Sequence, residues 1–536
     1  MASNCRFKGT FKAPAVQQPY SPRYEPLGQD SLSTDKRTPR RFGLVPSLCR
    51  VLACIAAALS VCLLFAVYSR GSAVGSSLSA TFTVKIATTT FLSTSGADRA
   101  TTISKHDFIA AVLRDPVEGL VDLGPIQKKC NEIKFQEGLI WQCAPVNGGI
   151  GNVVNMVLNC VRYALEAGAT TLVLSRIQIR GDNLIDLGNK DHTAEMSYLL
   201  DADYFVESWK LACPQMRALV SETDDPDYYN ATTSILPKAV LSPERVKNFE
   251  RRKYLIVDPT GWREAFDAWM FKYLDISGGN RSITTPPTPV RVWQNLAMYQ
   301  WNRLAHAPEF ANSFPRLFRQ LPAARRLAAS ALYNLGRKMN HSSVSDNILF
   351  LPTTTEKEEE FPSNTSIVNS LGPGRLASNG FLGAHLRVAA DAVAAGWPGY
   401  EAQAPLYIRE AKERNLSSVY LATGSAEHRD RFWKEAALEG LVTFTKEDLL
   451  DAEEREELAR MSWDQQALVD FEVLMHSAMF YGFVRSSFSW ALAMRRGTLP
   501  EAAGTAVYSE GEHEYRDGLS AIVGRHENMN PEGIWT

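Results

Sequence analysis

The stretch Phe381-Leu-Gly-Ala-His-Leu-Arg-Val-Ala-Ala-Asp391 decides the fold of this 536-residue chain. Its apolar first half predicts a short buried strand at 381–387. Strands of an open α/β sheet deliver their C-terminal residues into the ligand crevice. Arg387 there offers a rigid fork of N–H donors that suits a phosphate, and His385, two residues earlier, points to the same face. A surface ion pair between Arg387 and Asp391, with His385 merely packed, is the alternative.

Strands and helices alternate regularly after this stretch. The pattern predicts helices at 403–414, 427–438, 463–477 and 488–495, and strands at 418–422, 440–444 and 479–484. Such alternation is typical of a doubly wound parallel sheet with helices on both faces.

A second βαβ unit is predicted upstream, with strands at 138–143 and 170–175 and a helix at 153–167 between them. The middle of the chain is less regular: helices are expected at 292–306 and 317–339, and a short strand at 347–351. An acidic segment with prolines and glycines, 353–379, marks the boundary between lobes. The expected fold class is therefore α/β, with two Rossmann-like lobes facing a cleft: an N-terminal lobe at 106–365 and a C-terminal lobe at 375–536.

The loop Asn147-Gly-Gly-Ile-Gly-Asn152 joins the first predicted strand to its helix. Gly149 and Gly151 let the backbone approach a ligand closely, and free N–H groups at a helix start attract anions. The loop lacks the later glycine and the acidic residue of the dinucleotide fingerprint, and it lacks the Gly-Lys-Ser/Thr of a P-loop. A tight turn without a ligand is the alternative.

A third element is Arg485-Ser-Ser-Phe-Ser489, where a strand ends and a helix begins. Its hydroxyls and free amides either hold a phosphate or cap the helix. Thr423-Gly-Ser425 ends another strand beside the same crevice. Asp470, on the helix 463–477, turns toward the cleft or toward solvent. The acidic pairs Asp201-Ala-Asp203 and Asp225-Pro-Asp227 fit solvated loops better than a metal site, and no metal is predicted.

The N-terminal end predicts a membrane anchor. Residues 1–50 form a basic, polar cytoplasmic tail, and 51–68 give 18 residues without a charge, enough for one transmembrane helix. A Ser/Thr-rich stalk at 69–105 follows. We expect a single-pass type II protein of the Golgi or ER membrane with a lumenal catalytic part. A net charge of −2 does not suggest a nucleic-acid partner.

Features beyond the predicted span agree with a lumenal address. Asn-x-Ser/Thr sequons occur at Asn230, Asn280, Asn340, Asn364 and Asn415. Four cysteines, Cys130, Cys143, Cys160 and Cys213, predict two disulfides in an oxidising lumen and leave three connectivities open. Buried free thiols are the alternative.

Together these elements resemble the GDP-fucose protein O-fucosyltransferase family, in a fungal-type, type II membrane form. The resemblance runs from about Gly138 to Ile177 and from about Asn347 to Arg496. The matching motifs are Cys143–Asn152, Phe381–Arg387, Tyr420-Leu-Ala-Thr-Gly424 and Ser486–Ser489. It implies a GT-B fold, a GDP-sugar donor such as GDP-fucose, a hydroxyl of a glycoprotein or glycan as acceptor, inversion at the anomeric carbon, and no obligatory metal or other cofactor.

The resemblance also implies roles for individual residues. Arg387 would hold the β-phosphate and stabilise the leaving group, and Asn152, with Gly149 and Gly151, would face donor and acceptor from the other lobe. Contacts to the nucleotide would come from His385, Asp470, Ser487, Phe488 and Ser489. Some family members carry an acidic base in the first glycine loop, but 147–152 contains none, so the base stays open.

Two other functions compete with this hypothesis. A sulfotransferase is also often a type II lumenal protein, but it needs a basic phosphosulfate loop after the first strand, and 147–152 holds no Lys or Arg. A catalytically silent protein of the same fold, binding a sugar or nucleotide, would explain the missing acidic base. The resemblance does not separate GDP-fucose from other nucleotide sugars.

Overall fold

This computed structural model describes residues 104–114, 116–180, 192–224, 251–252, 255–256, 258–276, 290–295, 300–340, 380–510, 513–525 and 531–535. They belong to one compact unit, Arg99–Thr536. The predicted span at 51–68, the strand at 347–351 and the boundary segment at 353–379 lie outside the described residues. Among the residues described, no helix combines the length and the apolar character that crossing a membrane requires.

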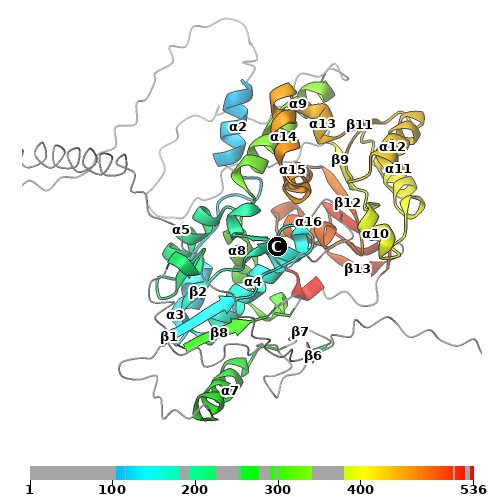
Figure 1. Ribbon diagram of the computed structural model, residues 1–536. Helices are drawn as coiled ribbons and strands as arrows, with labels where there is room; N and C mark the ends of the chain where they lie inside the picture. The colour runs from blue at the N-terminus through cyan, green and yellow to red at the C-terminus, as the bar shows by residue number, and fades with distance from the viewer. Residues whose placement is uncertain are drawn as a thin grey trace, which may run out of the picture. The chain divides into compact units, whose positions relative to one another are not determined.

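The N-terminal lobe is built on a four-stranded parallel sheet of order β5-β2-β1-β8 (Figure 1). Its strands are β1 (Gln136–Cys143), β2 (Ala169–Val173), β5 (Arg217–Leu219) and β8 (Val290–Gln294). Its helices are α3 (Gly124–Glu132), α4 (Ile150–Ala167), α5 (Ala202–Ala212), α7 (Trp262–Ile276) and α8 (Pro308–Ser313). Two short antiparallel pairs add β3 (Ile177–Gln178) with β4 (Thr193–Ala194), and β6 (Arg251–Arg252) with β7 (Leu255–Ile256).

Helix α4 is the centre of this lobe and confirms the helix predicted at 153–167. Its apolar residues surround the helix on all sides, and nearly all of them are buried, because α4 touches β1 and β2 on one side and α7, α15 and α16 on others. Gly149 caps its start, and Gly168 ends it in the left-handed region at φ 69°, where glycine carries no steric penalty.

The C-terminal lobe holds a seven-stranded sheet of order β11-β10-β9-β12-β15-β14-β13. The strands are β9 (Leu382–His385), β10 (Ser418–Ala422), β11 (Val442–Phe444), β12 (Met479–Phe483), β13 (Val507–Glu510), β14 (His513–Arg516) and β15 (Ser520–Val523). The helices are α10 (Ala390–Ala394), α11 (Ala404–Glu413), α12 (Ala426–Leu438), α13 (Lys446–Leu449), α14 (Ala452–Arg460), α15 (Trp463–Met475) and α16 (Ser487–Arg496). The predicted alternation of this lobe is confirmed.

Two expectations about secondary structure are wrong. The segment predicted as a helix at 292–306 contributes strand β8, whose alternate residues Val290, Val292 and Gln294 are buried, the period-2 pattern of a strand. The second sheet is not wholly parallel, because β13, β14 and β15 pair antiparallel beyond the last predicted helix.

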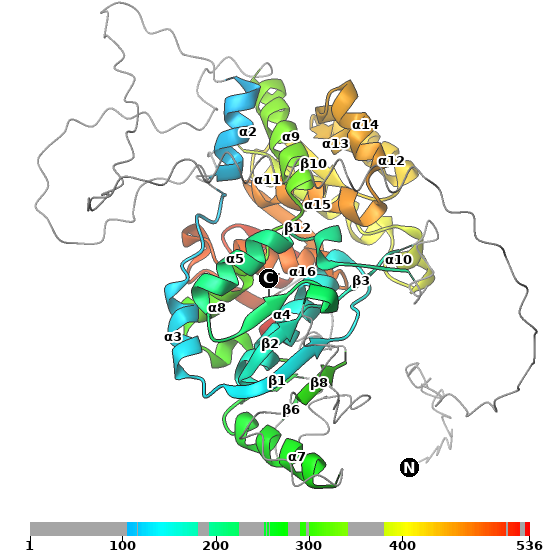
Figure 2. The same cartoon turned by 60° about the vertical axis from the view of Figure 1, so that its left-hand side comes forward.

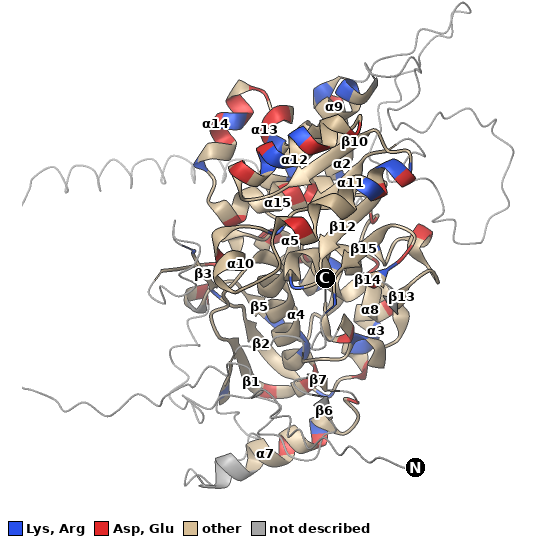
Figure 3. Cartoon of the chain, turned by 90° about the vertical axis from the view of Figure 1, so that its right-hand side faces the viewer, with Lys and Arg blue, Asp and Glu red and all other residues tan. Residues whose placement is uncertain are grey.

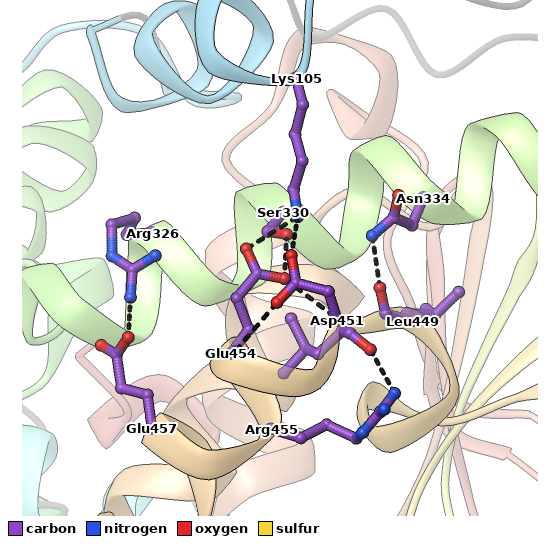
Figure 4. A network of polar contacts seen from close by, with 10 residues as sticks. Lys105, Arg326, Ser330, Asn334, Leu449, Asp451, Glu454, Arg455 and Glu457 are labelled. Atoms are coloured by element: carbon purple, nitrogen blue, oxygen red, sulfur yellow. Dashed lines mark hydrogen bonds and ion pairs between the residues drawn. The ribbon is translucent and has the colours of Figure 1, made fainter.

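Two helices that precede the C-terminal lobe in the sequence lie beside it in space. Helix α9 (Pro322–Asn340) packs against α2 (Lys105–Arg114), α13 and α15 (Figure 2), although 322–340 falls within the range predicted for the N-terminal lobe. Its buried Ser330 donates a hydrogen bond to Glu454 of α14 at 2.8 Å, and Asn334 donates to the backbone oxygen of Leu449 (Figure 4). In Figure 3 the ribbon is coloured at charged residues, which are frequent along α12, α13 and α14.

The C-terminal residues return to the N-terminal lobe. Trp535 is fully buried, its indole N–H donates to the backbone oxygen of Trp301 at 2.8 Å, and its ring meets Phe310 and Phe314 edge-on. Asn155 of α4 donates to the backbone oxygen of Gly533 at 3.0 Å. Two segments therefore link the lobes: α9 packs on the C-terminal lobe, and the last described residues pack on the N-terminal lobe.

Two disulfides stabilise the N-terminal lobe, as predicted, and the structure selects one of the three connectivities. Cys130 of α3 joins Cys213 at the end of α5, and Cys143 at the end of β1 joins Cys160 in α4. The second bridge fixes α4 against the strand that precedes it, so it also fixes the loop between them.

Candidate functional site

A cavity of about 420 Å³ is lined by both lobes at the C-terminal ends of β9 and β10. The start of α4 faces it from the N-terminal lobe, and the starts of α12 and α16 face it from the C-terminal lobe. Helix starts carry partial positive charge and unpaired N–H groups, so three of them converging on one cavity favour an anion. The predicted site residues that line it are Gly149, Asn152, His385, Arg387, Asp470, Ser487 and Phe488.

Arg387 faces this cavity and is held firmly. The side-chain amide of Gln403, which is fully buried, accepts from the Arg387 N–H at 3.0 Å and donates to the Arg387 oxygen at 3.2 Å. The guanidinium donates to Oδ2 of Asp391 at 2.5 Å and lies 5.5 Å from the ring centre of Trp397. The pair with Asp391 is thus real, but it lies inside the cavity rather than on the outer surface.

His385 is a neutral, buried side chain. Burial and the nearby Arg387 guanidinium lower its pKa from 6.5 to about 3, so the imidazole is uncharged at physiological pH. Its Nδ1 shares a hydrogen bond of 2.8 Å with the hydroxyl of Ser489, and Phe488 lies against the ring at 4.4 Å. The hydroxyl of Ser489 also accepts from the N–H of Phe483 at 3.1 Å. Ser489 does not line the cavity, so it positions His385.

The start of α16 presents its amides to the cavity. Ser486 is the N-cap and accepts from the N–H of Ser489, which leaves the N–H groups of Ser487 and Phe488 without an acceptor inside the helix. Both of these residues line the cavity. Ser486 therefore caps the helix, and the N–H groups of the next two residues are the ones placed at the cavity.

Gly151 lies beside this helix start rather than in the cavity. A Cβ built on Gly151 would lie 2.2 Å from the backbone oxygen of Ser487 and 2.8 Å from the nitrogen of Phe488. A Cβ on Gly149 would meet nothing within 4 Å. The two glycines of the loop therefore differ: Gly151 allows α4 and α16 to touch, and Gly149 forms open cavity wall. Asn152 lies in the first turn of α4, half-buried at the cavity edge.

Asp470 turns inward, and both of its oxygens are occupied. The hydroxyl of Tyr420 donates to Oδ1, and the ammonium of Lys446 donates to Oδ2, each at 2.8 Å. Burial opposes the charge on Lys446, but the carboxylates of Asp470 and Glu447 outweigh it and raise the pKa of the ammonium. Lys446 also lines the cavity, and a lone lysine at a helix start is too common a pattern to have predicted this position.

Arg180 is another cavity cation that the sequence analysis did not predict, as is Arg429. It follows β3 in the N-terminal lobe, its side chain is 4% exposed, and it donates to Oδ2 of Asp391 at 2.9 Å. Its guanidinium also lies 4.9 Å from the ring of Trp463 and 3.7 Å from a carboxylate oxygen of Asp464. No local pattern marks this residue, because its partner Asp391 is 211 positions away in the sequence.

The acidic pairs have no part in the cavity as described. Asp201 caps α5 by accepting from the N–H of Tyr204 at 3.1 Å, and Asp203 lies in the first turn of the same helix. Acidic side chains stabilise a helix start, which accounts for both residues. The pair at 225–227 lies outside the described residues.

No protein-family model matches this sequence, and no curated protein matches it either. Solved structures similar to this chain include POFUT1 in complex with GDP-fucose, at 12% sequence identity and a TM-score of 0.40, covering 74% of this chain and 100% of that chain. POFUT1 in complex with GDP is 13% identical, with a TM-score of 0.37, covering 73% and 100%. A mutant of Arabidopsis thaliana FUT1 in complex with GDP is 11% identical, with a TM-score of 0.30, covering 73% and 76%.

Proposed function

We propose that this protein is a glycosyltransferase that moves a sugar from a GDP-sugar, GDP-fucose in the first instance, to a hydroxyl of a glycoprotein or glycan. One observation carries the proposal: Arg387 and the amide-bearing start of α16 face the same interlobe cavity. A guanidinium and a helix start are the two groups best suited to bind a diphosphate. The motif resemblance, from Phe381–Arg387 to Ser486–Ser489, supports the choice of donor.

The proposed reaction needs little more than charge stabilisation from the protein. An acceptor hydroxyl oxygen attacks the anomeric carbon with inversion, the bond from that carbon to the β-phosphate oxygen breaks, and the hydroxyl proton leaves to the departing diphosphate or to water. Negative charge then grows on the departing diphosphate, where Arg387 and the amides of Ser487 and Phe488 are placed to stabilise it. Asn152 faces this point from the N-terminal lobe.

The carboxylates that line the described cavity are the candidates for a base that deprotonates the acceptor hydroxyl. Burial alone would raise the pKa of Asp391, but hydrogen bonds from Arg387 and Arg180 outweigh it and hold that pKa below its usual value. Asp470 is taken up by Tyr420 and Lys446. Asp391 is therefore a poor proton acceptor. Burial raises the pKa of Asp470, but both of its oxygens already accept hydrogen bonds. Burial alone would also raise the pKa of Glu447, the third carboxylate that lines the cavity, but the Lys446 ammonium outweighs it and lowers that pKa. The proposal therefore relies on the leaving group rather than on any of these three as a base.

The test is a nucleotide panel followed by a transfer assay. We expect GDP to raise the melting temperature of the purified chain in the presence of EDTA, because a ligand that binds only the folded state stabilises it. UDP and adenosine 3′,5′-bisphosphate should do so much less. Stabilisation by either of these, and not by GDP, would contradict the donor assignment; the bisphosphate would point to a sulfotransferase.

The second step separates an enzyme from a silent binding protein. We expect GDP to be released from GDP-fucose in the presence of glycoprotein acceptors, and the sugar to appear on the acceptor with inverted configuration. If the protein binds GDP tightly but releases no GDP from any GDP-sugar, the catalytically silent protein is favoured. The loop at 147–152, which contains no acidic residue, is compatible with that alternative.

We further propose a type II protein of the Golgi or ER membrane, anchored by 51–68. The two disulfides of the N-terminal lobe fit an oxidising compartment. Asn415 of the last sequon is exposed in a left-handed turn, φ 56°, where a glycan has room. Loss of one glycan on Asn415→Gln in membranes from expressing cells would support a lumenal C-terminal lobe, and an unchanged mass would count against it.

A further inference from the structure

The proposed donor site holds a second guanidinium, and it comes from the opposite lobe. Arg180 and Arg387 donate to the same atom, Oδ2 of Asp391, at 2.9 and 2.5 Å. Arg180 reaches this carboxylate from the N-terminal lobe, and Arg387 reaches it from the end of β9. All three side chains line the cavity.

Two guanidinium groups this close repel one another unless an anion lies between them. Asp391 supplies that anion, and Trp463 and Trp397 each lie against one of the two guanidiniums, at 4.9 and 5.5 Å. The planar stacking and the shared carboxylate hold both groups in fixed orientations. Burying charged groups costs desolvation free energy, which packing alone does not repay, because each buried charge needs partners of its own.

The charges show what Arg180 contributes. Arg387 and Asp391 by themselves form a neutral i,i+4 pair, which has little net attraction for an anion. When Arg180 shares the carboxylate, the pair gains positive charge on its cavity side. A carboxylate oxygen of Asp464 lies 3.7 Å from the Arg180 guanidinium. Asp464 does not line the cavity, so its negative charge lies on the side of Arg180 that faces away from the cavity.

Resting on the proposed function, we propose that Arg180 is a positioning residue of the donor site. Because Arg180 shares the Asp391 carboxylate, the positive charge of the Arg387 guanidinium is only partly neutralised and can attract the diphosphate. Because Arg180 belongs to the N-terminal lobe and Arg387 to the C-terminal lobe, diphosphate binding then depends on both lobes being in place. Neither residue contacts the nucleoside in this scheme, so the effect is confined to the phosphates.

The experiment measures how much the diphosphate adds to nucleoside binding. Dissociation constants of guanosine and GDP are determined by calorimetry for the full-length protein, and their ratio is compared among variants. We expect Arg180→Gln to lower that ratio by at least about tenfold, while the guanosine constant stays within about twofold. Arg180→Lys, which keeps the charge, should retain most of the ratio. Arg409→Gln, an exposed arginine on α11, is the control.

A double variant tests the mechanism. If Arg180 acts by neutralising Asp391, then Arg180→Gln with Asp391→Asn should restore the ratio, because the charge that needed neutralising is gone. A double variant as weak as Arg180→Gln would overturn the proposal, and so would an equal loss of guanosine and GDP, which marks a purely structural role. If the wild type binds GDP more tightly than guanosine and Arg180→Gln shows the same ratio of the two constants, this inference alone is overturned. A wild type that binds guanosine and GDP equally contradicts the proposed function as well.

Discussion

The backbones of Gly151 and Ser487 touch across the cleft, and any side chain at 151 would overlap the Ser487 carbonyl, 2.2 Å from its Cβ. Gly151 lies in the first turn of α4, and Ser487 begins α16; these two helices pack together between the lobes (Figure 1). The lobes therefore meet at a contact between two helix starts, next to the cavity that both helix starts line.

We predict that Gly151→Ala destabilises the protein and abolishes nucleotide binding. The clash is with backbone, which cannot rotate away, so the cost is expected at the upper end of overpacking, about 3 kcal/mol. Urea unfolding and GDP titration measure the two effects. Gly149→Ser is the matched control, because nothing lies within 4 Å of its Cβ position and serine is a good N-cap. Equal unfolding free energies for the two variants would contradict the contact.

Arg387→Ala should remove catalysis and leave the fold almost intact. Loss of a group that stabilises the leaving-group charge costs about 10²–10³ in rate, and Asp391 keeps Arg180 as a partner. Transfer rate and melting temperature are measured together, with Arg409→Ala as the surface control. A large fall in melting temperature with a modest loss of rate would make Arg387 a structural residue.

Two serines of one turn should respond in opposite ways. Ser489→Ala leaves the N–H of Phe483 without its acceptor and His385 without its partner, so we expect a loss of about 1–3 kcal/mol in unfolding free energy. Ser487→Ala removes only the hydroxyl at the cavity and keeps the N–H that is placed to meet a phosphate. Stability should therefore be unchanged, and GDP should bind only about three- to tenfold more weakly. Identical behaviour of the two variants would contradict the separation of a positioning serine from a contact serine.

Asp464 should make stability depend on pH. Burial raises its pKa from 3.8 to about 6, so the folded protein holds a proton that the unfolded chain has released. The penalty is therefore absent below about pH 4 and grows as pH rises through 6. Asp464→Asn should match the wild type at pH 4 and be more stable at pH 7.5, by up to about 3 kcal/mol.

Chemical denaturation at the two pH values checks this, with Asp430→Asn on the exposed face of α12 as control. A stability difference for Asp464→Asn that is the same at pH 4 and pH 7.5 would show that the carboxyl does not titrate in this range.

Local patterns were enough to predict the alternating strands and helices of the second lobe from β9 to α16. The strand expected at 418–422 is β10 itself, and the helix expected at 427–438 differs from α12 by one residue. Apolar runs and glycine breaks lie within each element, so no distant partner is needed to recognise them. The same logic placed Arg387 and His385 at the end of a strand facing a cavity.

Local patterns failed where pairing decides the structure. Val290–Gln294 is five residues long, too short to separate strand from helix by period, and its place beside β1 fixes it as a strand. Strands β13 and β14 lie in polar sequence and gain their order from antiparallel pairing beside β15, at the edge of the second sheet. Edge strands of this kind carry little periodic signal of their own.

By itself, the sequence determined the alternating elements, the strand that leads into Arg387, although that strand ends at His385, and the number of disulfides, because these follow from residue order over short distances. Only the tertiary structure decided that Cys143 bonds to Cys160, that Gly151 is a contact rather than a ligand site, and that Asp470 is held by Lys446. It also brought Arg180 to Asp391 across 211 positions. Such contacts form only when separate elements pack against one another, within a lobe or between the lobes, and no local stretch of sequence encodes which elements will meet.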